Sequence, residues 1–95
     1  MNIQFQITHF SADKKLKDFI KKKVDKLILI DDTIINTNIY LKVERAESYD
    51  NKVVEIRVHS SEGVFFAKKQ SNTFEESADL AAQALRKQMI KHKEK

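Results

Sequence analysis

The chain has 95 residues, of which 41% are hydrophobic and 34% are charged, a composition that fits one small folded domain and excludes a disordered chain. It contains no cysteine, which excludes a disulfide-bonded scaffold and thiolate metal sites and fits a reducing compartment. The net charge of +4 is mild, but the 18 basic residues are unevenly distributed. Seven lysines lie between residues 14 and 26, and five basic residues lie between 86 and 95. This clustering points to an anionic partner.

The first two predicted elements are a strand and an amphipathic helix. Residues 2–8 alternate between apolar and polar side chains, which is typical of a half-buried strand. The inward side chains of this strand are Ile3, Phe5 and Ile7. A helix is predicted from residue 12 to about 29, with Ser11 as its N-cap, Asp13 near its positive end, and Asp31–Asp32 as its terminator. Its buried stripe consists of apolar residues at helical spacing: Leu16, Phe19, Ile20, Val24, Leu27 and Ile28.

Three further strands are predicted in the middle of the chain. Residues 35–44 alternate again, with one set expected to face inward: Ile35, Thr37, Ile39, Leu41 and Val43. The outward set is Asn36, Asn38, Tyr40, Lys42 and Glu44. After a hairpin loop at 45–51, a third strand points Val54, Ile56 and Val58 inward and Glu55, Arg57 and His59 outward. A turn at 60–63 leads to a fourth strand at 64–70, whose facing stays open because its first four residues are all apolar.

The last predicted element is a second amphipathic helix that runs to about residue 92. Thr73 is expected to cap it, with the Glu76 side chain bonding back to the Thr73 backbone in a capping box. The predicted buried stripe is Phe74, Ala78, Ala81, Ala82, Leu85 and Met89. The fold class is therefore α+β, with the order β-α-β-β-β-α. We expect residues 1–95 to form one domain with a four-stranded mixed sheet, its first two strands parallel, two helices packed on one face and the other face open to water.

Several classes of function have no support in the sequence. It contains no nucleophile motif, no paired-glycine phosphate loop and no metal-ligand motif of the HExxH type. His9, His59 and His92 lie on separate predicted elements, so a shared metal or acid–base site is not expected. The longest apolar run, Leu27–Ile30, is too short to cross a bilayer, and the N-terminus lacks a signal-peptide pattern. We expect a cytoplasmic protein that is not an enzyme and has no cofactor, metal, membrane partner or small-molecule substrate.

The lysine-rich face of the first helix is the strongest functional signal. A solvated charged face is the ordinary alternative, because lysine favours helices and amphipathic helices need a polar side. Three observations favour a binding role: the density of lysines, the few local acids that offset them, and a second basic segment on the helix expected to pack beside the first. Clustered positive charges repel one another unless an anion uses them, and a phosphate backbone is the natural match. Two rigid helices with spaced cations suit a shaped RNA surface.

The chain also resembles a known family, the short ribosome hibernation promoting factors and ribosome-associated inhibitors, also called sigma-54 modulation proteins. The resemblance covers essentially the whole chain. It is carried by the N-terminal strand and by the segments LKDFIKKKVDKL at 16–27, YLKVER at 40–45 and LRKQMIKHK at 85–93, in this order. The chain departs from the family at Ala84, where a basic residue is usual, and at Thr73–Glu75, where Asp-Met-Tyr is common. The long members carry a further C-terminal dimerisation domain, which we expect to be absent here.

The resemblance implies a ribosome-binding domain that occupies the decoding region of the small ribosomal subunit, blocks the sites of transfer RNA and messenger RNA, and so silences idle ribosomes under stress. By position, Lys23 and Lys26 of the first helix and Lys87 and Lys91 of the second match the basic pattern of the family. The full set of basic residues expected to contact ribosomal RNA is Lys22, Lys23, Lys26, Lys42, Arg45, Arg86, Lys87, Lys91 and Lys93. Two alternatives stay open at this point: a general double-stranded-RNA-binding module, and a protein-interaction domain that modulates transcription.

Overall fold

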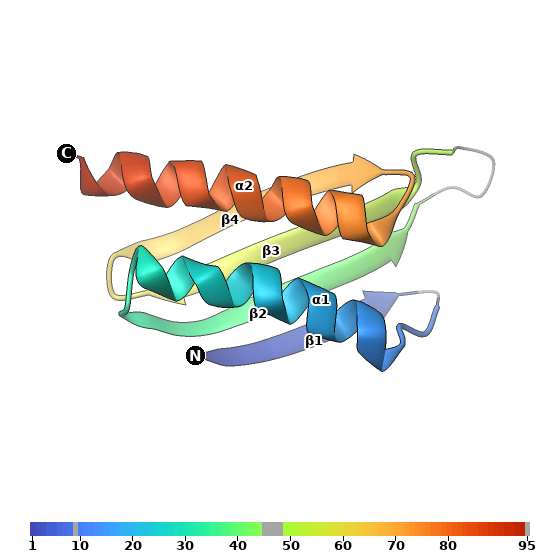
Figure 1. The fold of residues 1–95 in the computed structure, drawn as a ribbon, viewed down its shortest axis with the longest axis horizontal. Coiled ribbons are helices and arrows are strands. Elements are labelled where there is room, and N and C mark those ends of the chain that lie inside the picture. Colours follow the sequence, from blue (N-terminus) through green and yellow to red (C-terminus); the bar gives the residue numbers. More distant parts are fainter. Residues whose placement is uncertain (9, 45–48, 95) are drawn as a thin grey trace.

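The computed structural model describes residues 1–8, 10–44 and 49–94. Its elements in chain order are β1 (Asn2–Thr8), α1 (Lys14–Asp25), a short 3₁₀ helix η1 (Lys26–Leu29), β2 (Ile34–Val43), β3 (Lys52–Ser60), β4 (Gly63–Ser71) and α2 (Phe74–Lys93). The sheet has the order β1-β2-β3-β4, with β1 parallel to β2 and the other two pairs antiparallel. Both helices cross the same face of this sheet (Figure 1), which confirms the α+β fold class and the predicted element order.

The hydrophobic core lies between the sheet and the two helices. The inward residues in the middle of both strands are completely buried, as the alternation predicts: Thr37, Ile39 and Leu41 of β2 and Val54, Ile56 and Val58 of β3. Val43 at the end of β2 is only partly buried. Neighbours across the strands such as Ile39 and Ile56 pack side by side. The buried stripe predicted for α2 is confirmed at all six positions. Each fully buried Val, Leu or Ile contributes about 1.5–3 kcal/mol relative to an exposed one, so this layer is the main source of stability. The core also fixes the rotation of both helices about their axes, and therefore decides which polar side chains meet between them.

The start of α1 differs from the sequence prediction. Its N-cap is Asp13 and not Ser11, because the Asp13 carboxylate accepts a hydrogen bond from the Leu16 backbone N–H at 2.9 Å. Ser11 lies two residues too early to reach this free N–H, and a carboxylate also interacts favourably with the positive helix end. The α-helix is shorter than expected as well, since its last turn tightens into η1, where Ile30 N–H bonds to Leu27 C=O at 3.0 Å.

The start of β2 contains a second difference. Ile35 was predicted to face inward, but it is 65% exposed, and its neighbour Ile34 is buried in its place. The pairing of β2 with β3 shifts register between Ile34 and Asn36, as at a β-bulge. One extra residue reverses the facing of the strand on one side of the bulge, so the simple alternation fails only at this end. From Thr37 onward the predicted facing is confirmed.

The pairing of β4 with β3 settles the facing that the sequence left open. Phe65 and Ala67 lie opposite Val58 and Ile56, which belong to the core, so these two side chains point toward the helices. Val64 and Phe66 consequently point to the other face and are 60% and 57% exposed. The open face of the sheet thus carries more apolar surface than the outward residues of the other strands suggest.

The N-terminus of α2 is held as predicted, with one change of partner. The Thr73 hydroxyl accepts a hydrogen bond from the Glu76 backbone N–H at 3.1 Å, which confirms the cap. The Thr73 N–H, however, lies 3.4 Å from the Ser71 hydroxyl, which takes the place expected for the Glu76 side chain. The buried Ser77 hydroxyl donates to the Lys52 carbonyl at 2.6 Å and so joins the first turn of α2 to the beginning of β3.

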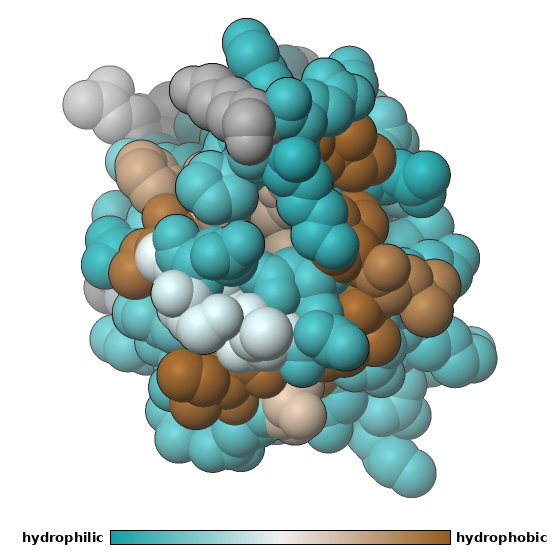
Figure 2. Space-filling model, turned by 90° about the vertical axis from the view of Figure 1, so that its left-hand side faces the viewer, coloured by the Kyte–Doolittle hydropathy of each residue, from teal (hydrophilic) through white to brown (hydrophobic). Residues whose placement is uncertain are grey.

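The molecule is elongated, with extents of 43 × 23 × 17 Å. The N-terminus, η1, the turn between β3 and β4 and the end of α2 gather at one end of the long axis (Figure 1). Figure 2 looks onto that end and shows apolar side chains in several separate patches, with hydrophilic side chains between them. Isolated apolar patches of this kind are normal for a solvated protein surface.

Candidate RNA-binding site

The two helices lie side by side over the sheet (Figure 1), and side chains from both line a groove between them. On α1 and η1, burial of Ile20, Val24 and Leu27 turns the adjacent Lys23 and Lys26 toward α2. On α2, the alanines of the buried stripe leave room for α1 to approach. Residues at helical spacing along the next face, Asp79, Gln83 and Arg86, therefore point into the same groove.

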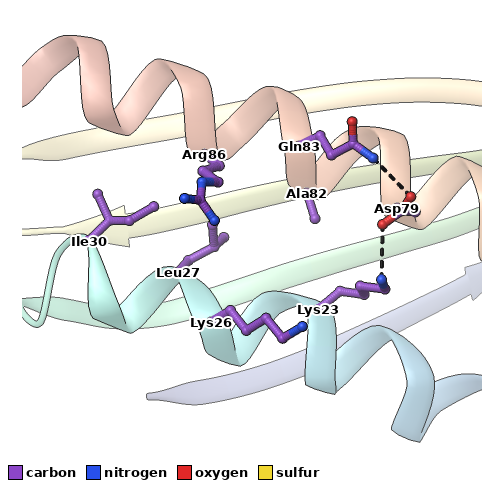
Figure 3. A pocket seen from close by; sticks show the side chains of 8 residues that line it. All are labelled: Lys23, Lys26, Leu27, Ile30, Asp79, Ala82, Gln83 and Arg86. Carbon is purple, nitrogen blue, oxygen red and sulfur yellow. Dashed lines mark hydrogen bonds and ion pairs between the residues drawn. The ribbon is translucent and has the colours of Figure 1, made fainter.

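The groove contains a pocket of about 150 Å³, which is shown in Figure 3. Its polar lining consists of Lys23, Lys26, Asp79, Gln83 and Arg86, and its apolar floor consists of Leu27, Ile30 and Ala82. Three positive groups face one negative group, so the pocket keeps a net positive charge. Lysine and arginine over an apolar floor can hold a phosphate group close to the protein without burying it.

The single carboxylate of the groove is already engaged. The Lys23 ammonium lies 3.0 Å from one oxygen of Asp79, and the Gln83 amide donates to the other oxygen at 2.9 Å (Figure 3). These contacts lower the pKa of the Asp79 carboxyl; the Lys23 hydrogen bond is the largest cause, partly opposed by desolvation. The ion pair ties α1 to α2 and at the same time neutralises one of the three cations that an anion would need.

The structure brings three of the nine predicted RNA-contacting residues together in this groove: Lys23, Lys26 and Arg86. Lys22 is exposed on the neighbouring side of α1 and does not line the pocket. Lys87 is exposed on α2, one residue on from Arg86 and therefore turned about 100° away from it around the helix. Both could extend the positive surface outward from the groove.

The remaining predicted residues lie elsewhere. Lys91 lines a shallow hollow with Phe65 and His92, so it faces β4 and not α1. The pKa of the buried Asp31 carboxyl is lowered mainly by the hydrogen bond from the Thr33 side chain, and Lys93 lies close enough to add the smallest of the contributions. Lys42 is on the open face of the sheet, 3.7 Å from Glu44. Arg45 and His9 lie outside the described residues. So does the first part of the predicted hairpin loop at 45–51.

Sequence reasoning missed Asp79 and Gln83 as parts of the site. An acid near the start of a helix, such as Asp79, is ordinarily explained by its favourable interaction with the positive helix end, which hides a role in binding. The available signal was the spacing of 79, 83 and 86, which places these residues on one helix face next to the buried stripe. That spacing does not say which residue of α1 lies opposite, and for this reason the pairing with Lys23 could not be found.

The part of the chain that the structure describes offers neither a metal centre nor a membrane-spanning helix. Residues 1–8, 10–44 and 49–94 contain no group of three histidine, cysteine or acidic side chains placed to hold a metal ion. Within the same ranges, no helix has the length and the apolar content to span a membrane.

Comparison with known proteins gives one family and a well-defined fold. The family model described as "Sigma 54 modulation protein / S30EA ribosomal protein" matches residues 3–95. Among solved structures, the chain is similar to a ribosomal subunit interface protein from Coxiella burnetii, with 23% identity, complete coverage of both chains and a TM-score of 0.87. It is also similar to the N-terminal domain of Protein Y from Thermus thermophilus, with 20% identity, coverage of 96% of this chain and 98% of that chain, and a TM-score of 0.82. No curated protein matches the chain.

Proposed function

Because the chain belongs to the sigma 54 modulation protein / S30EA ribosomal protein family, we propose that it is a ribosome hibernation factor that binds the small ribosomal subunit near the decoding region. Membership of this family makes the protein a ribosome-associated factor and not an enzyme. The finer proposal concerns what it touches and how it acts: residues 1–95 form one cytoplasmic domain that grips ribosomal RNA, and the bound domain inhibits translation.

The groove between α1 and α2 carries this proposal. Lys23, Lys26 and Arg86 converge there from two helices over a pocket of about 150 Å³. Cations from two rigid elements fix the direction of approach of a phosphate backbone, which loose surface lysines cannot do. The groove reads no bases, so its selectivity comes from the shape of the folded RNA that can reach it.

Inhibition follows from occupation of space. A rigid body with extents of 43 × 23 × 17 Å, held by its helix face, excludes transfer RNA and messenger RNA from the volume that it fills. No chemical step is required, in agreement with the absence of a catalytic motif in the sequence. The proposed partners are therefore the small ribosomal subunit and its RNA, with no cofactor, membrane or small-molecule substrate.

The test is co-sedimentation of purified small subunits with the wild-type protein and two triple variants. The groove variant is Lys23→Glu, Lys26→Glu and Arg86→Glu. The control variant is Lys14→Glu, Lys15→Glu and Lys17→Glu, which makes the same change in net charge at the start of α1, outside the groove. We expect the groove variant to lose binding, whereas the control keeps most of it. Equal loss in both variants would show attraction to total charge only.

A competition experiment separates this proposal from a general double-stranded-RNA-binding module. Plain duplex RNA is added to the complex of protein and small subunit. We expect a hibernation factor to stay on the subunit at a molar excess of duplex. Release by equal amounts of duplex would favour the general module, and binding that survives ribonuclease would favour a protein-interaction domain.

A further inference from the structure

The face of the sheet opposite the helices has no element packed on it in the described structure (Figure 1). Its strand residues are fixed by the pairing of the four strands, because neighbouring residues across the sheet share a face. The rings of Tyr40 in β2 and Phe66 in β4 lie on this face, as does the His59 imidazole, and Arg57 of β3 lies between Tyr40 and Phe66. The proposed function leaves this surface unused.

These three side chains form a row across the sheet. The Arg57 guanidinium lies 5.5 Å from the centre of the Tyr40 ring, a cation–π contact. On the other side, Arg57 is the direct register partner of Phe66. The row is diagonal, because Tyr40 pairs with Glu55 and lies two residues along β2 from Asn38, the partner of Arg57. Two strand spacings and this two-residue offset place the backbone positions of Tyr40 and Phe66 about 12 Å apart, with Arg57 on the strand between them.

The row is held in place and accessible. Arg57 Nε donates a hydrogen bond to Glu55 at 2.6 Å, which fixes the plane of the guanidinium while half of the side chain stays exposed. Phe66 is 57% exposed, which is unusual for a phenylalanine without a partner. Tyr40 also borders a shallow hollow with Thr8 and Lys42. Arg57 and Tyr40 thus present planar groups that are held against each other, and Phe66 presents an exposed ring on the next strand.

The charge around the row is positive. In the strands that the structure describes, Glu55 is the one acidic residue of this face, and its charge is paired with Arg57. Lys68 lies directly across from Glu55 on the same face, and Lys42 lies nearby, 3.7 Å from Glu44 beyond the end of β2. Amide side chains from β1 and β2, among them Gln4 and Asn38, add hydrogen-bond donors and acceptors beside the row. Rings, a stacked guanidinium, cations and amides together suit nucleotides, since bases stack on planar groups and phosphates pair with lysines.

From this arrangement we infer that the open face of the sheet is a second RNA-binding surface, which takes a single-stranded segment by stacking unpaired bases on Tyr40, Arg57 and Phe66. A duplex hides the faces of its bases, so it cannot use this row. A protein partner would be expected to need a larger apolar patch than two separated rings. The helix groove lies on the opposite side of the sheet, so one domain can hold folded RNA on one face and an unpaired strand on the other.

The experiment uses the full chain and a fluorescein-labelled single-stranded oligoribonucleotide of mixed sequence, about 10 nucleotides long, because an extended strand of that length covers the whole row. The chain has no tryptophan and only two tyrosines, so Tyr49→Phe leaves Tyr40 as the sole tyrosine and a local reporter. We expect the oligonucleotide to quench Tyr40 fluorescence and to bind with an affinity that Phe66→Leu lowers about tenfold, since each stacked base contributes that order of affinity. Phe66→Trp, which keeps a planar ring, is expected to bind at least as well as the wild type.

Two controls keep the inference open to refutation. Phe66→Leu preserves apolar bulk at an exposed position, so a thermal melt close to that of the wild type will confirm folding. The groove variant of Lys23, Lys26 and Arg86 is expected to keep Tyr40 quenching even where it loses small subunits. The inference is overturned if Phe66→Leu and Tyr40→Leu bind the oligonucleotide as the wild type does, or if the groove variant alone abolishes its binding. Neither result would affect the helix groove as the site for the ribosome.

Discussion

The carboxylate of Asp79 competes with RNA phosphate for Lys23, and removing its charge should strengthen binding. In the wild-type protein the Lys23 ammonium lies 3.0 Å from the Asp79 carboxylate. Asp79→Asn keeps the shape of the side chain and an oxygen that can accept a hydrogen bond from Gln83, but it removes the charge that holds Lys23. In the wild-type protein an incoming phosphate has either to displace Asp79 or to approach a negative charge. The asparagine variant removes both obstacles.

The size of the effect follows from exposure. The Lys23 and Asp79 side chains are 31% and 39% exposed, so their ion pair is a surface pair, worth about 0.2–1 kcal/mol. Repulsion between the carboxylate and a phosphate about 4 Å away in a watery groove adds about 1 kcal/mol at most. Together these effects give an affinity for small subunits that is roughly fivefold higher in Asp79→Asn. One more free cation also makes the salt dependence steeper, by at most about 0.9 in the log–log slope.

The assay is filter binding or sedimentation with purified small subunits over a series of salt concentrations. Glu62→Gln in the turn between β3 and β4 is the matched control, because it removes one negative charge away from the groove. We expect tighter binding and a steeper slope for Asp79→Asn and little change for Glu62→Gln. Weaker binding of Asp79→Asn would refute this reasoning, since it would mean that Asp79 positions Lys23 for RNA and does not compete with it. Equal gains in both variants would assign the effect to net charge.

Three further predictions concern stability. Asp31→Ala should lower the free energy of unfolding by about 1–3 kcal/mol at pH 7 in a urea titration, because the carboxylate accepts hydrogen bonds from Thr33, whereas Asp32→Ala should change little. The pKa of Asp31 is lowered by folding, so its contribution to the free energy of unfolding is complete above about pH 4 and is lost at lower pH. If the difference in this free energy between the wild type and Asp31→Ala fails to narrow in acid, the reasoning is wrong. Leu85→Ala, at a completely buried position, should cost about 2–5 kcal/mol in the same titration. Thr73→Ala should cost about 1 kcal/mol through loss of the helix cap, and a null result would mean that Ser71 holds this end alone.

Most of the fold could be predicted because the chain repeats a few strong signals. Strict alternation in β1 and in most of β2 and β3, together with six apolar positions at helical spacing in α2, leaves one arrangement that buries every stripe. The local differences have local causes. A register shift at Ile34 cannot be seen in an alternation that continues through it, and a cap at Asp13 competes with a serine nearby of nearly equal preference.

The candidate site could be predicted only in part, because it depends on contacts between elements. The sequence indicates that both helices are basic, and it identifies Lys23, Lys26 and Arg86 among other cations. Which of these converge is decided by how the buried stripes turn the two helices, and this selects three residues of the nine. The exposure of Phe66 likewise follows from its pairing with Arg57, which no pattern within β4 contains.

The most direct measurement is the affinity of the intact wild-type protein for purified small ribosomal subunits as the salt concentration is raised. We expect retention at modest ionic strength and a log–log slope of roughly −3, the value for about four neutralised phosphates. A protein that is not retained at modest ionic strength, or whose retention does not change with salt, would contradict the assignment of the cations between α1 and α2 to ribosomal RNA.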